Sequence, residues 1–574
     1  MTVQTLETDS SLIEALAEVF GSVLCGRNPD TRADLLDLGL NSVLVAQSVV
    51  LARRRGIVFS PREVYLNRTI ERLSKRVRAS SSQAPGSSRD ADTEPVPLTP
   101  TKAFGLVAGR GERYNIYAAW KVPPRVIDLD VLEAAIAWII RNHEDLRLQF
   151  RRMPDGRLEQ TVAAASPQTC LEQVDLSRRD STEAAALAED MMAEMQHGFK
   201  FRDEPLYRFA VFKLDPAGNA ILFIMLHQFL TDAFGFRTLA ETISEVYRAL
   251  STGKDPSACR DGAGQSVCWA RRLHAYANGS ARDEIATWKS LPWSDIRPLR
   301  CDFTPEQGRS RGTDLDLLNE ADARRLFEIG KGLGCEPTLA ERRRTLVTQG
   351  IVPAALDKGY SERLFSLSRR EMAGGFGDFD VVALAALDSV KFLSATPVFW
   401  VDTWSSTRAG VFDDLDVATT LGNVSEVTPF VFSLEDGRTD ADRLRAIRLA
   451  RISMPCLGIG FRALKFLNEH PAERAALVDL PFPEVCINYR ASLQYFRPRN
   501  LLGLEEYDGW TGQGTDDGGR KDRFQFRLSW DGERTDIAVR YDATAYSVDT
   551  AIDVTARFQA RLEELIDQTA RRLN

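Results

Sequence analysis

The chain has 574 residues, of which 44% are hydrophobic and 27% are charged, with a net charge of -8. This length exceeds one ordinary core and predicts about two to three globular units. The acidic balance argues against a nucleic-acid partner, because phosphate binding needs a basic face. The N-terminus has no basic start followed by an apolar core, and the apolar runs are far shorter than the roughly 20 residues that span a bilayer. We therefore expect a globular cytoplasmic protein with no membrane contact.

The eight cysteines lie far apart in the sequence, with no Cys-x-x-Cys pair and no histidine couple nearby to complete a zinc site. We interpret them as buried thiols and predict no metal centre.

The first 79 residues have the pattern of a small four-helix bundle. Apolar residues recur at helical spacing over residues 11–24, a second helix is predicted to begin at Ser42, and residues 70–77 predict a short last helix. Ser42 follows the glycine-containing loop 37–41. From spacing alone, the simpler interpretation of Ser42 or Asn41 is a helix cap.

Between residues 79 and 100 the chain is rich in Ser, Pro, Ala and charge without apolar periodicity, which is typical of a flexible tether. We place a linker at residues 80–96. The rest alternates helices and strands, which favours an α/β architecture. We divide it into an N-terminal lobe (97–270) and a C-terminal lobe (271–574).

Two apolar runs, 207–214 and 220–226, flank a turn rich in Asp, Gly, Asn and Pro and predict a β-hairpin. Helices are predicted at 132–141 and from about 236 to 250, and further strands at 146–151, 158–165, 397–404 and 428–434. We interpret residues 332–379 as a partly helical segment between the lobes with little strand character.

Polar residues follow directly after the second run of this hairpin. Considered alone, His227 has the simpler interpretation of a packed core histidine, and Asp232 has that of a helix cap or an ion-pair partner. The context of these residues adds a second interpretation.

Residues 37–42, the apolar helix after them and residues 59–73 together resemble the acyl or peptidyl carrier family over about 70 residues. The resemblance implies a 4′-phosphopantetheine arm on Ser42, in a Gly-Leu-Asn-Ser variant of the family's motif, with the phosphate at a helix start. Such a carrier delivers a thioester and raises its effective concentration at a partner site.

The segment His227-Gln228-x-x-x-Asp232-Ala233 resembles the His-His-x-x-x-Asp-Gly element of condensation domains of nonribosomal peptide synthetases. Asp232 stands four residues after Gln228, so the family's catalytic histidine corresponds to Gln228. Further resemblances follow in the family's order at residues 97–102, 141–150, 199–208, 416–429, 458–461 and 487–489. Together they cover roughly residues 95–570 and imply two α/β lobes like those of chloramphenicol acetyltransferase, with latch and floor elements in the second lobe.

The resemblance also implies that Asp232 is structural and pairs with an arginine, for which Arg147 is our candidate. Besides Gln228, Ala233 departs from the family's glycine, and residues 403–408 replace a His-Gly-Arg-like element. His227 is the nearest other histidine, but on a strand its side chain should point to the face opposite Gln228.

Two functions remain open at this point. In the first, the condensation domain is an amide-forming acyltransferase: glutamine is no base near neutral pH, but it can donate to an oxyanion or accept from an amine. In the second, a degenerate condensation fold serves as a docking platform for a tailoring enzyme that acts on the carrier-bound residue. Ester formation or epimerisation is a lesser alternative, and epimerisation needs a base.

The implied partners are a phosphopantetheinyl transferase, an adenylation enzyme in trans, and further carrier proteins or a free amine acceptor. No segment resembles an adenylation domain, so we expect the carrier to be loaded by another protein.

Overall fold

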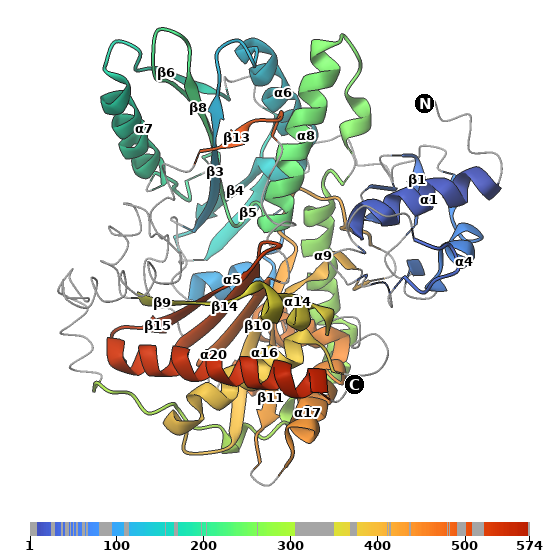
Figure 1. The fold of residues 1–574 in the computed structure, drawn as a ribbon, viewed down its shortest axis with the longest axis vertical. Coiled ribbons are helices and arrows are strands. Elements are labelled where there is room, and N and C mark those ends of the chain that lie inside the picture. The colour runs from blue at the N-terminus through green and yellow to red at the C-terminus, as the bar shows by residue number, and fades with distance from the viewer. Residues whose placement is uncertain are drawn as a thin grey trace.

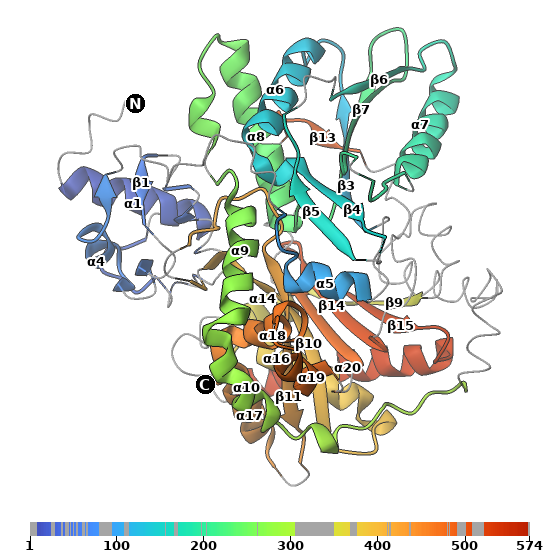
Figure 2. The ribbon, with the colours of Figure 1, turned by 180° about the vertical axis from the view of Figure 1, so that it is seen from behind.

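The computed structural model describes residues 9–24, most of 29–79, and residues 95–107, 114–304, 349–367, 376–490, 501–507 and 522–571, with short gaps inside several of these ranges. Figure 1 shows two α/β lobes, one above the other, with the small N-terminal bundle at their side. Figure 2 shows the same arrangement from behind.

The N-terminal bundle (residues 9–79) is organised by one apolar cluster that includes Phe20, Phe59 and Leu73. Its described elements are α1 (Asp9–Val23), β1 (Ile57–Val58), α4 (Ile70–Ser74) and β2 (Arg78–Ala79). The first predicted helix is thus confirmed by α1, and α4 is capped by Thr69, which accepts a hydrogen bond from the amide of Arg72. The predicted helix from Ser42 is helical at its described positions 45, 48–49 and 51–52, and its start lies outside the described residues.

The N-terminal lobe is built on a five-stranded sheet in the order β13-β3-β8-β7-β6. Its elements are α5 (Pro100–Val107), β3 (Asn115–Val122), α6 (Leu129–Asn142), β4 (Leu148–Arg152), β5 (Leu158–Val162), β6 (Glu172–Asp175), α7 (Ser181–Gln196), β7 (Tyr207–Lys213), β8 (Ala220–His227) and α8 (Ala233–Ser251). Strand β8 is central and buried along its whole length, because α6 and α8 contribute to the apolar cluster on one face and α7 to the cluster on the other.

The C-terminal lobe is built on a six-stranded sheet in the order β11-β10-β12-β14-β15-β9. Its elements are α9 (Gln265–Asn278), α10 (Ile285–Lys289), β9 (Gln349–Leu356), α14 (Lys358–Ser366), α16 (Asp378–Val390), β10 (Val398–Ser406), β11 (Ser425–Ser433), α17 (Asp440–Ile452), α18 (Ile459–Leu467), α19 (Pro471–Val478), β12 (Val485–Arg490), β14 (Phe524–Trp530), β15 (Thr535–Asp542) and α20 (Val548–Arg571). Helices α16 and α20 pack together across the sheet in Figure 1, and α9, α18 and α19 lie on the other side in Figure 2.

The lobes exchange segments. Strand β13 (Glu505–Glu506) follows β12 in the chain but pairs with β3 of the N-terminal lobe, and Leu421 and Leu501 join that lobe's core. In the other direction, α5 packs against α18 and β11. The lobe boundary predicted at residue 270 falls inside α9, which contributes to the cores of both lobes.

Most predicted elements of the N-terminal lobe are confirmed, namely those matching α6, α8, β7 and β8, and β7 and β8 pair as the predicted hairpin. The strand predicted from residue 146 starts later, because residues 144–147 form a 3₁₀ turn (Glu144–Arg147).

The prediction of little strand character over residues 332–379 is wrong for its described part. Residues 349–356 form β9, which pairs with β15 along its full length. Opposite Tyr541, Gly350 leaves room for the ring, since a Cβ at Gly350 would lie 2.0 Å from the tyrosine Cε1. Tertiary pairing rather than local propensity forms this edge strand.

Six of the cysteines lie among the described residues, and all six are free thiols. Only Cys486 is buried and Cys268 is exposed, so the prediction of buried thiols is wrong for most of them. Within the described residues, no helix is long and apolar enough to cross a bilayer, and no group of three or more His, Cys, Asp or Glu side chains could hold a metal.

Candidate functional site

Gln228 is the first residue after β8, where the central strand of the N-terminal lobe ends. Its backbone amide donates to the Tyr114 carbonyl at 2.7 Å, and its side-chain Nε2 donates to the Asn115 carbonyl at 3.1 Å. The start of β3 therefore fixes both the backbone and the side chain. The side chain is half-buried, and among the described residues no donor reaches its Oε1.

His227 is fully buried and belongs to an aromatic cluster. Its ring centroid lies 4.8 Å from that of Phe229 and 5.3 Å from that of Phe201, and its Nδ1 accepts a hydrogen bond from the Phe229 amide at 3.0 Å. The side chains of His227 and Gln228 thus have separate surroundings, in line with the alternation of strand residues. His227 is placed to pack the loop after β8.

Asp232 caps α8, and its carboxylate is almost fully buried. It accepts hydrogen bonds from the Gly235 amide, from the Val424 amide and from the Ser425 hydroxyl. The Arg408 Nη2 lies 2.8 Å from its Oδ1 in a buried ion pair. The predicted partner, Arg147, is therefore wrong, and Arg408, from the altered element at 403–408, takes that place.

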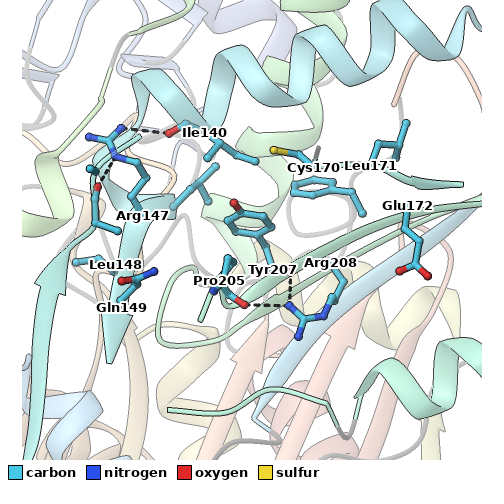
Figure 3. Close-up of a pocket in the computed structure, with 14 residues that line it drawn as sticks. Ile140, Arg147, Leu148, Gln149, Cys170, Leu171, Glu172, Pro205, Tyr207 and Arg208 are labelled. Carbon is cyan, nitrogen blue, oxygen red and sulfur yellow. Dashed lines mark hydrogen bonds between the residues drawn. The ribbon is translucent and has the colours of Figure 1, made fainter. Parts of the chain in front are cut away.

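Arg147 lies elsewhere because it belongs to the 3₁₀ turn after α6. Its Nε donates to the Ala163 carbonyl at 3.0 Å, and its Nη1 donates to the Arg141 carbonyl at 2.6 Å. These bonds fasten the end of α6 to the segment after β5, and the side chain lines a pocket (Figure 3). A structural role for Arg147 remains a prediction, with backbone carbonyls in place of Asp232 as its partners.

A strap of the C-terminal lobe, residues 416–424, crosses onto the N-terminal lobe where the sequence resembles a latch. Arg408 holds the strap through the carbonyls of Val417, Thr420 and Gly422. The close approach requires Gly235, since a Cβ there would lie 2.3 Å from the Leu421 carbonyl oxygen. One guanidinium thus joins the strap to Asp232 and to the start of α8.

The strap also reaches the candidate catalytic position. Asn423 Nδ2 donates to the Gln228 carbonyl at 2.5 Å, and the Asn423 amide donates to the Leu230 carbonyl at 2.9 Å. The backbone of Gln228 is therefore positioned by β3 on one side and by the strap on the other.

A second buried polar group joins the lobes near the strap. Glu426 accepts hydrogen bonds from the Thr101 amide at 3.0 Å and the Thr101 hydroxyl at 2.6 Å, and Lys102 Nζ donates to Gln160 at 2.8 Å. Burial lowers the pKa of Lys102 to about 7, against the opposing charges of Asp145 and Glu426. Burial likewise raises the pKa of Glu426 to about 7.

The sequence motifs at 97–102 and 416–429 contain Lys102 and Glu426, but their positions in sequence did not assign them a role. A lysine and a glutamate next to apolar runs were the available signal.

Ser42 lies outside the described residues. On either side of it, Leu40 and Val45 are buried in the core of the bundle, and residue 45 is helical. The same apolar cluster includes Ala418 of the strap, which is fully buried, so the bundle packs against the strap that holds Gln228.

The described residues have the architecture of a small helical bundle followed by a two-lobed α/β domain, with a polar motif at the junction of the lobes. Residues 10–77 match the phosphopantetheine attachment site family, and residues 96–284 match the condensation domain family. The chain therefore carries a phosphopantetheine-binding carrier domain followed by a condensation domain, and a 4′-phosphopantetheine arm is implied on a serine of the carrier.

Curated relatives agree with this assignment. A linear gramicidin synthase protein of Brevibacillus parabrevis is 23% identical over 83% of this chain, which corresponds to 6% of that protein. A plipastatin synthase protein of Bacillus subtilis is 19% identical over 99% of this chain and 15% of its own length. The chain thus spans a small part of the relatives that it matches.

Solved structures show the same fold beyond the segment matched by the condensation family. The epimerization domain from the third module of tyrocidine synthetase B has a TM-score of 0.65 and 17% identity, covering 84% of this chain and 99% of that domain. The X-domain from teicoplanin biosynthesis has a TM-score of 0.57 and 20% identity, covering 84% and 96%. In its complex with OxyB, the X-domain has a TM-score of 0.56 and 19% identity, covering 85% and 97%.

Proposed function

We propose that this chain forms an amide bond between an acyl group held by its carrier domain and an acceptor amine. One observation carries the proposal: Gln228, which we align with the family's catalytic histidine, is held by Tyr114 and Asn115, and no donor among the described residues reaches its Oε1. The phosphopantetheine arm, proposed on Ser42, supplies the acyl group as a thioester. The amine nitrogen forms the new C–N bond, the C–S bond breaks, and the arm leaves as a thiol that takes up the proton lost by the amine. We assign the carrier to residues 1–79, the tether to 80–96 and the two lobes to 97–574.

Gln228 acts by positioning rather than by removing a proton. Its Oε1 accepts a hydrogen bond from an N–H of the acceptor amine, which directs the nitrogen lone pair toward the acyl carbon. Orientation of two held reactants is worth about 7–11 kcal/mol, whereas general acid–base assistance contributes about 10²–10⁴-fold. The larger effect does not need a base, provided that the amine arrives unprotonated.

The other residues of the site hold this geometry. Asn423 and the start of β3 fix the Gln228 backbone, and the Asp232–Arg408 pair fixes the strap that carries Asn423. His227, closed in by aromatic rings, supports the loop by packing.

We infer the partners from the two domain families. A phosphopantetheinyl transferase would prime Ser42, an adenylation enzyme in trans would load the arm, and the acceptor would be a free amine or a residue on a further carrier protein. A cytoplasmic location remains our prediction from the sequence.

A docking platform for a tailoring enzyme is the second candidate. Two observations favour it: one of the two N–H groups of the Gln228 side-chain amide already donates to the Asn115 carbonyl, which leaves one for an oxyanion, and one structural neighbour is an X-domain in complex with OxyB. In this alternative, the condensation fold binds an enzyme that modifies the residue on the carrier.

One experiment separates the two candidates. The chain is primed with phosphopantetheine, loaded with an aminoacyl group, incubated with candidate amines, and its products are measured by mass spectrometry. We expect an amide product that falls at least tenfold in Gln228→Ala and is unchanged in Gln173→Ala, an exposed glutamine of β6. Absence of the phosphopantetheine mass from Ser42→Ala checks the attachment site.

Product that forms equally well with Gln228→Ala would contradict the catalytic role. If no amine gives product while an oxidase or hydroxylase binds the loaded chain tightly, the docking function is correct instead.

A further inference from the structure

A pocket of about 420 Å³ lies in the N-terminal lobe, and Gln228 is not part of its lining. Its walls come from the end of α6, strand β4, the residues around β5 and β6, and the start of β7 (Figure 3). Strands β4 and β5 form a separate two-stranded sheet, so side chains bound the space between this hairpin and β7. The volume lies in the range of about 300–1,000 Å³ usual for small-molecule sites.

Two guanidinium groups line the pocket and are held in place before any ligand enters. Arg147 donates to the carbonyls of Ala163, Ile140 and Arg141. Arg208 Nη1 donates to the carbonyls of Pro205 and Tyr207, each at 2.9 Å. The Arg208 guanidinium also lies 4.9 Å from the centre of the Phe199 ring. Figure 3 shows Tyr207 between the two arginines.

The positive charge of these groups is only weakly compensated. All five of these bonds go to neutral carbonyls, and among the described residues Arg147 has one long ion pair, in which Glu144 Oε1 lies 3.9 Å from Nη2. Burial lowers the pKa of Arg208, while the charges of Glu204 and Glu172 oppose that shift from longer range. Partly buried cations without a bonded carboxylate favour an anion beside them.

Of the other polar groups that line the pocket, Glu172 is an acid whose charge acts on Arg208, whereas Tyr207 and Cys170 are neutral. Burial raises the pKa of Tyr207 to about 12, and burial also raises the pKa of the Cys170 thiol. At neutral pH both keep their protons, so they offer hydrogen bonds and the thiol is a poor nucleophile. The pocket is thus arranged for reversible binding rather than for covalent capture.

Apolar side chains complete the lining: Ile140, Leu146, Leu148, Leu171 and Phe209. An inorganic anion would leave this surface uncovered, whereas an apolar ligand would leave the arginines unpaired. We propose that the pocket binds a small organic carboxylate with an apolar body, with its carboxylate beside Arg208. This inference does not depend on the proposed function of Gln228.

The segment that leads into β7 connects the pocket to the His227–Asp232 motif. Leu206, next to the lining residues Pro205 and Tyr207, accepts a hydrogen bond from the His227 amide at 2.8 Å. A ligand would therefore contact the strand that supports the start of the His227–Asp232 loop.

The test is calorimetric titration of the phosphopantetheinylated full chain with octanoate, octanol, octylamine and inorganic phosphate. We expect saturable binding of octanoate, at least tenfold weaker binding of octanol and phosphate, and no binding of octylamine. Arg208→Gln should weaken octanoate binding at least tenfold, because a charge-assisted pair is lost. Arg178→Gln, which removes an exposed arginine outside the pocket, should leave it unchanged.

A second measurement uses the unaltered chain, so it decides the question even if Arg208→Gln does not fold. Octanoate should slow alkylation of Cys170 by N-ethylmaleimide, measured on its peptide by mass spectrometry. Alkylation of the exposed Cys268, which does not line the pocket, should stay the same. Equal binding of octanol, tighter binding of phosphate, octanoate affinity unaffected by Arg208→Gln, or alkylation of Cys170 unaffected by octanoate would each overturn the proposal.

Discussion

Asp232 and Gln228 belong to one short motif, yet the protein holds them very differently. The Asp232 carboxylate accepts bonds from Gly235, Arg408, Val424 and Ser425 and is 7% exposed. The Gln228 side chain is half-buried and donates a single bond, to the Asn115 carbonyl. A buried charge must be fully satisfied, whereas a group that contacts substrate needs unused bonding capacity. Asp232 is thus held on every side by the fold, whereas Gln228 keeps the bonding capacity that the role proposed for it requires.

Removing the partner of Asp232 should have the largest effect. Arg408→Met leaves a buried carboxylate without its counter-ion and frees three strap carbonyls, so we expect a loss of about 3–5 kcal/mol in the free energy of unfolding. Urea unfolding followed by circular dichroism measures it. Arg179→Met is the control: this exposed pair with Glu183 should contribute less than about 1 kcal/mol. Similar losses in the two variants would mean that the bonds of Arg408 to Asp232 and to the strap do not stabilise the lobe junction.

A substitution at Glu426 tests whether the lobe junction tolerates a buried carboxylate whose hydrogen bonds come from the neutral residue Thr101. The pKa of Glu426 in the folded protein, about 7, lies above the ordinary value of 4.5, so the folded state binds the proton more tightly. The stabilisation from this proton is complete below pH 4.5 and is lost as the pH rises through 7.

Glu426→Gln cannot titrate at this position. We therefore expect the stability of the unaltered chain, relative to Glu426→Gln, to fall by about 3 kcal/mol between pH 4.5 and pH 8. Urea unfolding of both proteins across this range measures the difference. A difference that stays constant with pH would show that Glu426 is not buried as described.

Asn423 connects the surroundings of Asp232 with those of Gln228, because it belongs to the strap but bonds to Gln228. Asn423→Ala should cost about 1 kcal/mol of stability through the loss of its hydrogen bond to the Gln228 carbonyl. It should lower kcat of amide formation about tenfold, equivalent to about 1.4 kcal/mol, with KM little changed. A raised KM at unchanged kcat would assign Asn423 to binding instead of positioning.

Gln228→Ala should have the smallest effect on stability, less than about 1 kcal/mol, since the side chain is half-buried and donates one bond. Thermal unfolding measures the change in stability, and the product assay measures the change in amide formation on the same protein. A stability loss as large as that of Arg408→Met would make Gln228 a structural residue and remove the contrast with Asp232.

Local patterns are enough to predict the elements that carry the site. The hairpin of β7 and β8 is a pair of apolar runs around a strong turn, and α8 follows at helical spacing, so the sequence alone places Gln228 after a buried strand. Strand β9 was missed because its pairing partner, β15, lies about 180 residues later in the chain. Long-range pairing leaves no local signature that distinguishes such an edge strand.

The sequence by itself determined the two domain families and the capping or pairing role of Asp232, and it supplied the alignment on which the role proposed for Gln228 rests. These follow from short-range spacing and from residues that share one helix or strand. Only the tertiary structure decided that Arg408 and not Arg147 pairs with Asp232, that the strap joins Gln228 to the second lobe, and that Arg147 and Arg208 share a pocket. Each of these depends on which segments meet across a lobe or between lobes, and chain distance does not reveal which arginine a buried carboxylate will meet.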